Sequence, residues 1–320
     1  MSKALIERRL RELKEYIDET LERIDLTSLH PLMEAPVRYM LRTGGKRLRP
    51  LICLLSAELV GGERERAVKP FLALELIHNG TLIHDDIIDE DETRRGRPSV
   101  HITYGVKRGI LAGDILLSLG LHHASETGDP RIVEWLSETA SKMVQGVALQ
   151  THYRRRILSE EEYLEIAYLK SGSLFEASAA LGALIGGGGD EEVKRLADFG
   201  RCFGVAYQIR DDVQGILNGD EALNDLVNGD VTLPLIYALQ SPTLTEMDRG
   251  KLLRAYEEGR PIEAGEVRRI YTETNALSKS VEKMRLYAEG CIDALKDFNP
   301  SPPLECLLHL VERYYLNLEV

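Results

Sequence analysis

Apolar residues recur at spacings of three and four along nearly the whole chain, which is the repeat of helices that bury one face. The repeat is clear in segment 4–24, in the largely apolar segment 68–88 and again in segment 280–295. No stretch alternates with the period of two that marks a strand, and glycine and proline clusters separate the apolar segments. The sequence therefore predicts an all-α fold of about a dozen helices.

We expect individual helices at residues 4–24, 36–41, 51–60, 68–88, 109–123, 131–150, 159–169, 172–185, 191–217, 232–239, 245–257, 266–277, 280–295 and 304–316. Ser159 and Glu162 form a capping box at the start of one of them. No Pro/Ser-rich linker or change of composition divides the series, so we predict a single domain over residues 1–320.

The charge and cysteine content narrow the classes of partner and compartment. A net charge of −12 argues against nucleic acid as the main partner, because phosphate backbones attract basic surfaces. The four cysteines are scattered, which is typical of free thiols in a reducing compartment. The N-terminal segment lacks the apolar core of a signal peptide, and no apolar run reaches the roughly 18 residues that span a bilayer. We therefore expect a soluble, cytoplasmic protein with no transmembrane segment.

An acidic cluster, HDDIIDEDE, ends the apolar segment 68–88. Asp85 and Asp89 are four residues apart, so a helix places both carboxylates on one face, with Asp86 one step round. Like charges at this spacing repel, and burying them is costly without compensation. A hard divalent ion such as Mg²⁺, bridging carboxylates and phosphate oxygens, supplies that compensation. A solvated acidic helix end is the alternative, and the cluster alone does not decide between the two.

Basic residues follow a double glycine in GGKRLRP, which places Lys46 and Arg49 three apart and so on one helical face. His78 lies seven residues before Asp85, on the same face of its helix. Each of these groups alone is more often a solvated surface side chain. Together with Arg95, however, Lys46 and Arg49 fit one diphosphate.

Two further cations fit a second diphosphate together with metal ions. Arg94 follows the acidic cluster, and Lys170 stands at an interruption between two expected helices. Downstream, QIRDDVQG is an incomplete copy of HDDIID, in which Gln208 shares a helical face with Asp211 and Asp212.

Five motifs occur in a characteristic order, namely GGKRLRP, HDDIIDEDETRRGRPSVH, LAGDILLS, KSGSLFEASAALGALIGG and YQIRDDV. With them the chain resembles the trans-prenyl diphosphate synthases, also called polyprenyl synthetases, over essentially its full length. The first aspartate-rich motif with its RRG tail is the most specific of the five. The resemblance implies an all-α helical bundle around a deep central cavity, with the two aspartate-rich segments facing each other across its mouth. It also implies a homodimer.

The resemblance further implies a role for each matching residue. Ligands of Mg²⁺, with three ions expected beside a bound diphosphate, would be Asp85, Asp86, Asp89, Asp211 and Asp212. The allylic prenyl diphosphate would be bound by Arg94, Lys170, Ser171 and Gln208, of which Arg94, Lys170 and Gln208 are the candidate catalytic residues. Isopentenyl diphosphate would be bound by Lys46, Arg49, His78 and Arg95. Ser171 replaces the more usual threonine and keeps the hydroxyl group.

The implied reaction begins when metal and cations stabilise the leaving diphosphate, so that the allylic C–O bond ionises. The double bond of isopentenyl diphosphate then attacks the carbocation, and a proton is lost to the departing diphosphate. The product of twenty carbons or more is expected because Gly80 and Thr81 stand where a bulky aromatic stops growth early in the family. The alternative is that Gly80 only allows close helix packing.

Several positions depart from the family pattern. Gly215 replaces the third aspartate of the second motif, the loop 218–223 has no lysine, and Asp230 stands where a second lysine is usual. Val147 and Gln150 replace a polar/acidic pair. These changes leave open a weakly active or non-catalytic prenyl-diphosphate-binding subunit of a heteromeric synthase. A terpene cyclase is disfavoured, because cyclases do not need the isopentenyl diphosphate site.

Overall fold

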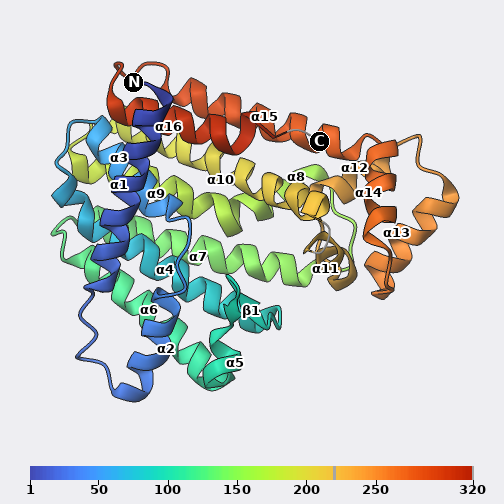
Figure 1. Ribbon diagram of the computed structural model, residues 1–320, viewed down its shortest axis with the longest axis horizontal. Coiled ribbons are helices and arrows are strands. Elements are labelled where there is room, and N and C mark those ends of the chain that lie inside the picture. Colours follow the sequence, from blue (N-terminus) through green and yellow to red (C-terminus); the bar gives the residue numbers. More distant parts are fainter. Residues whose placement is uncertain (219–220, 319–320) are drawn as a thin grey trace. The chain divides into compact units, whose positions relative to one another are not determined.

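The computed structural model describes residues 1–218 and 221–318, which form helices almost throughout (Figure 1). The α-helices are α1 (Lys3–Glu22), α2 (Pro31–Leu41), α3 (Leu48–Leu59), α4 (Val68–Ile88), α5 (Val100–Tyr104), α6 (Val106–Ser125), α7 (Pro130–His152), α8 (Glu160–Ala167), α9 (Ser173–Gly186), α10 (Asp190–Asn218), α11 (Glu221–Asn228), α12 (Leu233–Gln240), α13 (Glu246–Glu258), α14 (Ala264–Glu273), α15 (Ala276–Leu295) and α16 (Pro302–Val311). The other elements are the 3-10 turn η1 (Arg64–Ala67), the π-helical turns η2 (Tyr168–Gly172) and η3 (Glu312–Leu316), and the paired strands β1 (Thr93–Arg94) and β2 (Arg97–Pro98). The predicted all-α fold is confirmed.

The predicted helix positions agree with the structure except at a few places. The segment 68–88 is a helix over the predicted range, whereas α2 begins at Pro31, five residues earlier than predicted. The helix expected at 266–277 ends at Glu273, and α15 begins at Ala276 after Asn275 adopts a positive φ of 59°. The short helices α5 and α11 were not predicted.

The chain forms two compact units, each assembled from separate segments. Unit 1 contains Met1–Ala140, Ala177–Ala197 and Phe298–Leu307, and unit 2 contains Ser141–Glu176, Asp198–Asp297 and Leu308–Val320. The boundaries at residues 140, 176, 197 and 307 fall inside helices. The single domain over residues 1–320 stays a prediction.

In unit 1, helices α4 and α6 run side by side and touch through glycines (Figure 1). A Cβ added to Gly120 would lie 2.7 Å from Ile77, and one added to Gly80 would lie 2.9 Å from the carbonyl oxygen of Gly113. Gly113 in turn faces the ring of His84. The missing side chains let the two backbones approach closely, and this contact fixes the acidic end of α4 within unit 1.

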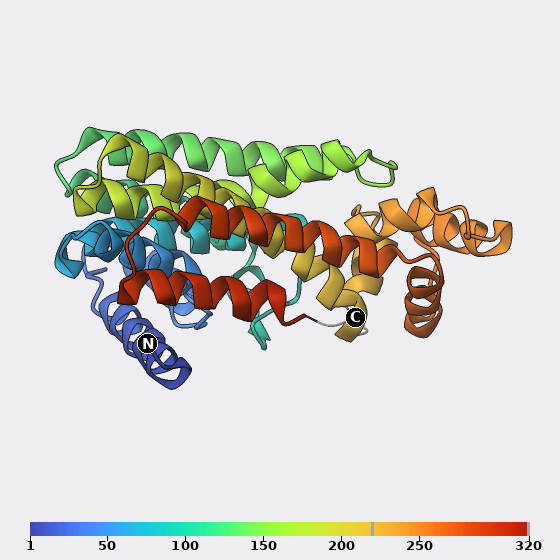
Figure 2. The same ribbon diagram turned by 90° about the horizontal axis from the view of Figure 1, so that it is seen from above.

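In unit 2, the short helices α12, α13 and α14 gather at one end of α15 (Figures 1 and 2). The middle of α10 is held by an aromatic cluster, in which Phe203 contacts Phe175 and Tyr315 at ring-centroid distances of 5.3 Å and 5.0 Å. The hydroxyl of Tyr315 also donates to the carbonyl of Phe203 at 2.7 Å. Such packing fixes the second aspartate-rich segment within its unit. None of the helices in the described residues is both long and apolar enough to cross a membrane.

Candidate active site

The three aspartates at the acidic end of α4 lie in two different environments. Asp85 and Asp89 are half-buried and share one face of the helix, whereas Asp86 is only 1% exposed. Arg94 donates from Nε to Asp86 Oδ1 at 2.7 Å, and Asp86 Oδ2 has no hydrogen-bond partner in the described part of the chain. Burial raises the pKa of the Asp86 carboxyl, and Arg94 acts in the opposite direction. Asp86 is therefore bound to Arg94 through one oxygen, and its role as a metal ligand beside Asp85 and Asp89 stays a prediction.

A tight hairpin, which was not predicted, directs the two arginines of the RRG tail. Strands β1 and β2 pair Arg94 with Arg97, and the two loop residues Arg95 and Gly96 have φ angles of 53° and 74°. Positive φ at both central residues is typical of the type I′ turn that closes two-residue hairpins. Arg94 contacts Asp86, whereas Arg95 donates to the carbonyl of Gly44.

The residues predicted to bind isopentenyl diphosphate converge in unit 1. Arg49 Nη1 lies 3.2 Å from His78 Nε2, and Arg95 reaches the loop that precedes Arg49. Desolvation, followed by the charges of Arg49 and Arg95, lowers the pKa of His78 well below its ordinary value. His78 is thus neutral at pH 7, and its Nε2 accepts the hydrogen bond because a guanidinium can only donate. Lys46 is exposed and precedes α3, so the prediction that it shares a helical face with Arg49 was wrong.

The predicted interruption at Lys170 is the π-helical turn η2, which joins α8 to α9 without a break. Lys170 Nζ donates to Gln150 Oε1 at 2.8 Å, and Ser171 Oγ donates to Gln208 Oε1 at 2.8 Å. Gly146 on α7 allows this turn to come close, because a Cβ there would lie 2.5 Å from the backbone nitrogen of Lys170. Unit 2 therefore brings together three predicted allylic-site residues, Lys170, Ser171 and Gln208. Arg94 belongs to unit 1, and its grouping with them stays a prediction.

Asp211 and Asp212 of the second motif differ in exposure, as Asp85 and Asp86 of the first motif do. Asp212 is buried, and its Oδ2 accepts from the Tyr163 hydroxyl at 2.7 Å and from the backbone nitrogen of Leu233 at 3.1 Å. Gln208 Nε2 donates to its other oxygen at 3.2 Å. Burial raises the pKa of Asp212 to about 6, although these hydrogen bonds oppose the rise. Both oxygens of Asp212 accept hydrogen bonds within unit 2, whereas Asp211 is exposed. The roles of both residues as metal ligands stay predictions.

Two of the positions that depart from the family pattern touch each other. Gln150 Nε2 donates to Asp230 Oδ1 at 3.1 Å, and Arg154 Nε donates to the same oxygen at 2.9 Å. Gln150 thus joins Lys170 to Asp230 through its two amide atoms. The lysine-free loop noted at 218–223 includes residues 219–220, which lie outside the described residues.

The two residues predicted to set product length differ in their surroundings. Gly80 faces α6, where Gly113 and Leu116 leave no room for a side chain, so close helix packing accounts for this glycine. Thr81 is half-buried, and its hydroxyl donates to the carbonyl of His78 at 2.9 Å. The packing of Gly80 against α6 favours the alternative that this glycine allows close helix packing, and the roles of Gly80 and Thr81 in product length stay predictions.

A family model described as polyprenyl synthetase matches residues 30–274, which is most of the chain. The chain belongs to the polyprenyl synthetase family. This membership confirms the predicted activity, transfer of a prenyl group by a trans-prenyltransferase.

Curated relatives and solved structures agree with this assignment. The polyprenyl synthetase is 37% identical over 261 residues to a short chain isoprenyl diphosphate synthase of Methanothermobacter thermautotrophicus, covering 78% of this chain and 79% of that protein. It is 36% identical to a geranylgeranyl diphosphate synthase of Sulfolobus acidocaldarius, covering 87% of this chain and 80% of that protein. A polyprenyl synthase of Caulobacter crescentus CB15, solved with calcium and isoprenyl diphosphate, superposes with a TM-score of 0.85 at 28% identity, covering 97% and 94% of the two chains.

The donor atoms of this polyprenyl synthetase fit a metal that is shared with its substrate. In residues 1–218 and 221–318, no three histidine, cysteine, aspartate or glutamate side chains are placed to hold an ion by themselves. Mg²⁺ is ordinarily bound by one or two carboxylates together with substrate phosphates and water. The half-buried carboxylates of Asp85 and Asp89 lie at the C-terminal end of α4, where the helix dipole also favours a cation.

Proposed function

We propose that this polyprenyl synthetase joins an allylic prenyl diphosphate to isopentenyl diphosphate and releases a prenyl diphosphate of twenty carbons or more. The observation that carries the proposal is the contact of Arg49 with His78, beside Arg95. A neutral histidine that accepts from an arginine adds no negative charge that would compete with an anion, and planar guanidinium groups match phosphate oxygens. A terpene cyclase would have no use for this cluster.

Each group of residues has its own task in the proposed reaction. Lys46, Arg49 and Arg95 bind and orient the diphosphate of isopentenyl diphosphate, so that its double bond is held ready for attack. Lys170 and Gln208 bind the allylic diphosphate and stabilise the negative charge that develops as it leaves. Mg²⁺, bound by Asp85 and Asp89 and by Asp211, would add further positive charge to the same leaving group.

The proton balance requires no basic side chain. Carbon–carbon bond formation leaves a cation on the former isopentenyl unit, and loss of a proton from that unit restores a double bond. The released diphosphate carries enough negative charge to accept this proton. His78 is neutral and bound to Arg49, so its proposed task is to hold the guanidinium in place.

We also propose a homodimer and a cytoplasmic location. Large apolar side chains stand exposed along α6 and the end of α5, namely Ile102, Val106, Ile110, Leu111 and Leu121, with exposed fractions from 36% to 53%. Exposed apolar side chains gathered in this way on two neighbouring helices are typical of a subunit interface. All four cysteines are free, which agrees with a reducing compartment.

The alternative is a weakly active or non-catalytic prenyl-diphosphate-binding subunit. It is favoured by the hydrogen bonds that engage both oxygens of Asp212 and by the replacement of a lysine by Asp230. Such a chain would bind prenyl diphosphates and need a competent relative for turnover.

Turnover of labelled isopentenyl diphosphate by the purified chain with Mg²⁺ separates the two functions. Allylic primers of five, ten, fifteen and twenty carbons would be supplied one at a time, and the products measured by chromatography. We expect elongation with at least one primer. Failure with every primer, together with activity on addition of a related synthase, would replace the first function by the second.

A further inference from the structure

One arginine of the basic loop, residues 43–49, is buried. Arg47 lies between Lys46 and α3, it is 6% exposed, and its φ of 55° is in the left-handed region. Left-handed backbone is uncommon for a residue with a side chain, so the surrounding contacts must hold it there. Lys46 is exposed and Arg49 half-buried, which makes Arg47 the buried member of the three.

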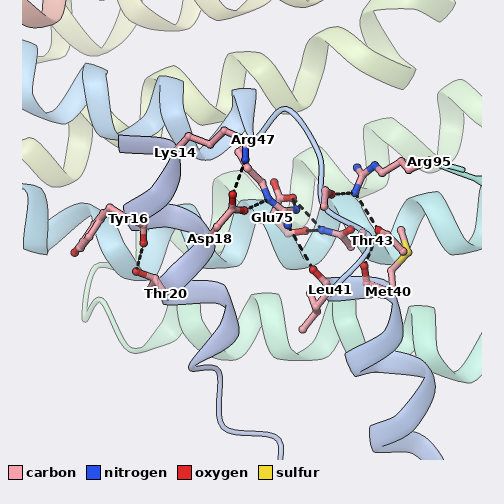
Figure 3. Close-up of polar contacts among 12 residues, drawn as sticks. Lys14, Tyr16, Asp18, Thr20, Met40, Leu41, Thr43, Arg47, Glu75 and Arg95 are labelled. Atoms are coloured by element: carbon pink, nitrogen blue, oxygen red, sulfur yellow. Dashed lines mark hydrogen bonds and ion pairs between the residues drawn. The ribbon is translucent and has the colours of Figure 1, made fainter. Parts of the chain in front are cut away.

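The Arg47 guanidinium connects three separate elements (Figure 3). Its Nε donates to Asp18 Oδ1 of α1 at 2.7 Å, and its Nη1 donates to Glu75 Oε1 of α4 at 2.5 Å. A longer bond of 3.4 Å runs from Nη2 to the carbonyl of Leu41 at the end of α2. Planar guanidinium groups suit this arrangement, because their donors point in fixed directions.

Glu75 is the carboxylate of this network that is shielded from water. It is 2% exposed, and Asn79 Nδ2 donates to its Oε1 at 3.1 Å. A buried carboxylate needs a charged partner, and Arg47 provides it. The pair therefore fixes where the loop crosses α4, one turn before His78.

A second contact holds the same loop from its other side. Arg95 Nη1 donates to Thr43 Oγ1 at 3.2 Å and to the carbonyl of Gly44 (Figure 3). The Thr43 hydroxyl donates to the carbonyl of Met40 at 2.8 Å. Beside Asp18 and Arg47 lies a cavity of about 250 Å³, which gives the loop room to move if the arginine is lost.

We propose that Arg47 is a positioning residue, whose pairs with buried Glu75 and half-buried Asp18 hold the loop 43–49 in the shape that presents Lys46 and Arg49 to isopentenyl diphosphate. This inference rests on the proposed function of that loop. It gives α1 a task in substrate binding, because the α1 residue Asp18 contacts Arg47 directly. Lys14, also on α1, holds Asp18 through an ion pair of 2.5 Å.

The deciding experiment replaces the pair by apolar residues of similar size. The single variant Arg47→Met leaves Glu75 buried without its charge partner and is expected to unfold at a lower temperature. The double variant Arg47→Met/Glu75→Leu removes both charges, which is commonly neutral for stability. We expect the double variant to keep its fold but to raise the KM for isopentenyl diphosphate by about ten- to a hundredfold, because small misplacements of binding groups are costly. The KM for the allylic primer should stay within about twofold of the wild type.

A matched control is Arg64→Met, which removes an arginine that pairs with Glu58 at 3.0 Å and does not touch the loop. Its KM values should equal those of the wild type. A stable double variant with a wild-type KM would overturn the proposal and leave the Arg47–Glu75 pair a purely stabilising contact.

A measurement without substrate separates this inference from the proposed function. Amide hydrogen exchange of segment 42–48 should be faster in the double variant than in the wild type, whether or not the wild type turns over isopentenyl diphosphate. If the wild type proves inactive but the double variant still exchanges faster than the wild type, the positioning role is retained and only the proposed reaction is rejected. Equal exchange in the two proteins would reject the positioning role.

Discussion

Gln150 and Asp230 contact each other directly, with Gln150 Nε2 donating to Asp230 Oδ1 at 3.1 Å. Each is a departure from the family pattern, the first from an acidic residue and the second from a lysine. Arg154 donates to the same aspartate at 2.9 Å. The two changes therefore belong to one rearranged polar cluster, in which the acidic partner now comes from position 230 and Arg154 supplies the cation.

Substitutions that restore a lysine at position 230 and an acidic residue at position 150 test whether the two positions act together. Asp230→Lys places a cation against Arg154, and we expect it to lower the free energy of unfolding by about 2 kcal/mol and the kcat by about tenfold. Gln150→Asp/Asp230→Lys restores opposite charges and should recover most of both losses. Chemical denaturation and steady-state kinetics measure the outcome, with the exposed reversal Glu246→Lys as the control. Equal losses in the single and double variants would show that the two positions act independently.

Asp85 and Asp212 should respond differently to the same chemical change. Asp85→Asn removes one proposed metal ligand, and we expect turnover to fall by about a hundredfold or more while the melting temperature stays near that of the wild type. Removing Mg²⁺ with a chelator should abolish turnover by the wild type. Exposed Glu134→Gln is the control for loss of an acidic charge.

Asp212→Asn should act mainly on stability, because the carboxylate oxygens accept from Tyr163, Leu233 and Gln208. An amide nitrogen facing the backbone N–H of Leu233 or the hydroxyl of Tyr163 loses an acceptor, at a cost of about 1–3 kcal/mol. Thermal unfolding measures this directly. A collapse of activity with unchanged stability would return Asp212 to the metal site.

His78 gives the protein a predictable dependence on pH. Its folded-state pKa is lowered, first by desolvation and then by nearby arginines, from an unperturbed value of 6.5. The unfolded chain therefore binds the proton more readily, so the contribution to stability is present above pH 6.5 and is lost as the pH falls below it. Unfolding curves from pH 7.5 to 5.5 should show a steeper loss for the wild type than for His78→Gln. If stability falls with pH equally in the wild type and in His78→Gln, the assignment of His78 as a histidine that folding keeps neutral is wrong.

Substitutions at Gly80 and Thr81 should separate folding from product length. Gly80→Ala brings a methyl group to 2.9 Å from the Gly113 carbonyl, and we expect a loss of about 1–3 kcal/mol of stability. Thr81→Phe should cost less stability and shift the products towards shorter chains. Chromatography of the products with thermal unfolding measures both effects, and an unchanged product distribution in Thr81→Phe would place the limit on chain length elsewhere.

The sequence predicted helices well where apolar spacing alone decides them. Segment 68–88 is long, largely apolar and bounded by an acidic run, and its helix spans the predicted residues. The hairpin at Thr93–Pro98 was missed because two-residue strands are too short to show a period. Lys46 was placed on a helix because nothing in GGKRLRP indicates that Arg47 adopts left-handed backbone and delays the start of α3 to Leu48.

Individual roles within the predicted motifs depended on contacts that spacing cannot reveal. Asp85 and Asp86 are neighbours in the sequence, yet the hairpin that carries Arg94 engages only the second. The same holds for Asp211 and Asp212, because Tyr163 and Leu233 approach Asp212 from other helices of unit 2. Motif matching therefore found residues that gather within each unit, and tertiary contacts show how their surroundings differ.

The close glycine contact between α4 and α6 also restricts how the enzyme can diversify. A side chain at Gly80 would have to push apart two helices that hold the acidic end of α4, so changes there lower stability and with it the amount of folded enzyme. Thr81 is one residue further along and is not subject to that contact. New product lengths should therefore arise in descendants of this chain by single substitutions at Thr81, with Gly80 carried along unchanged.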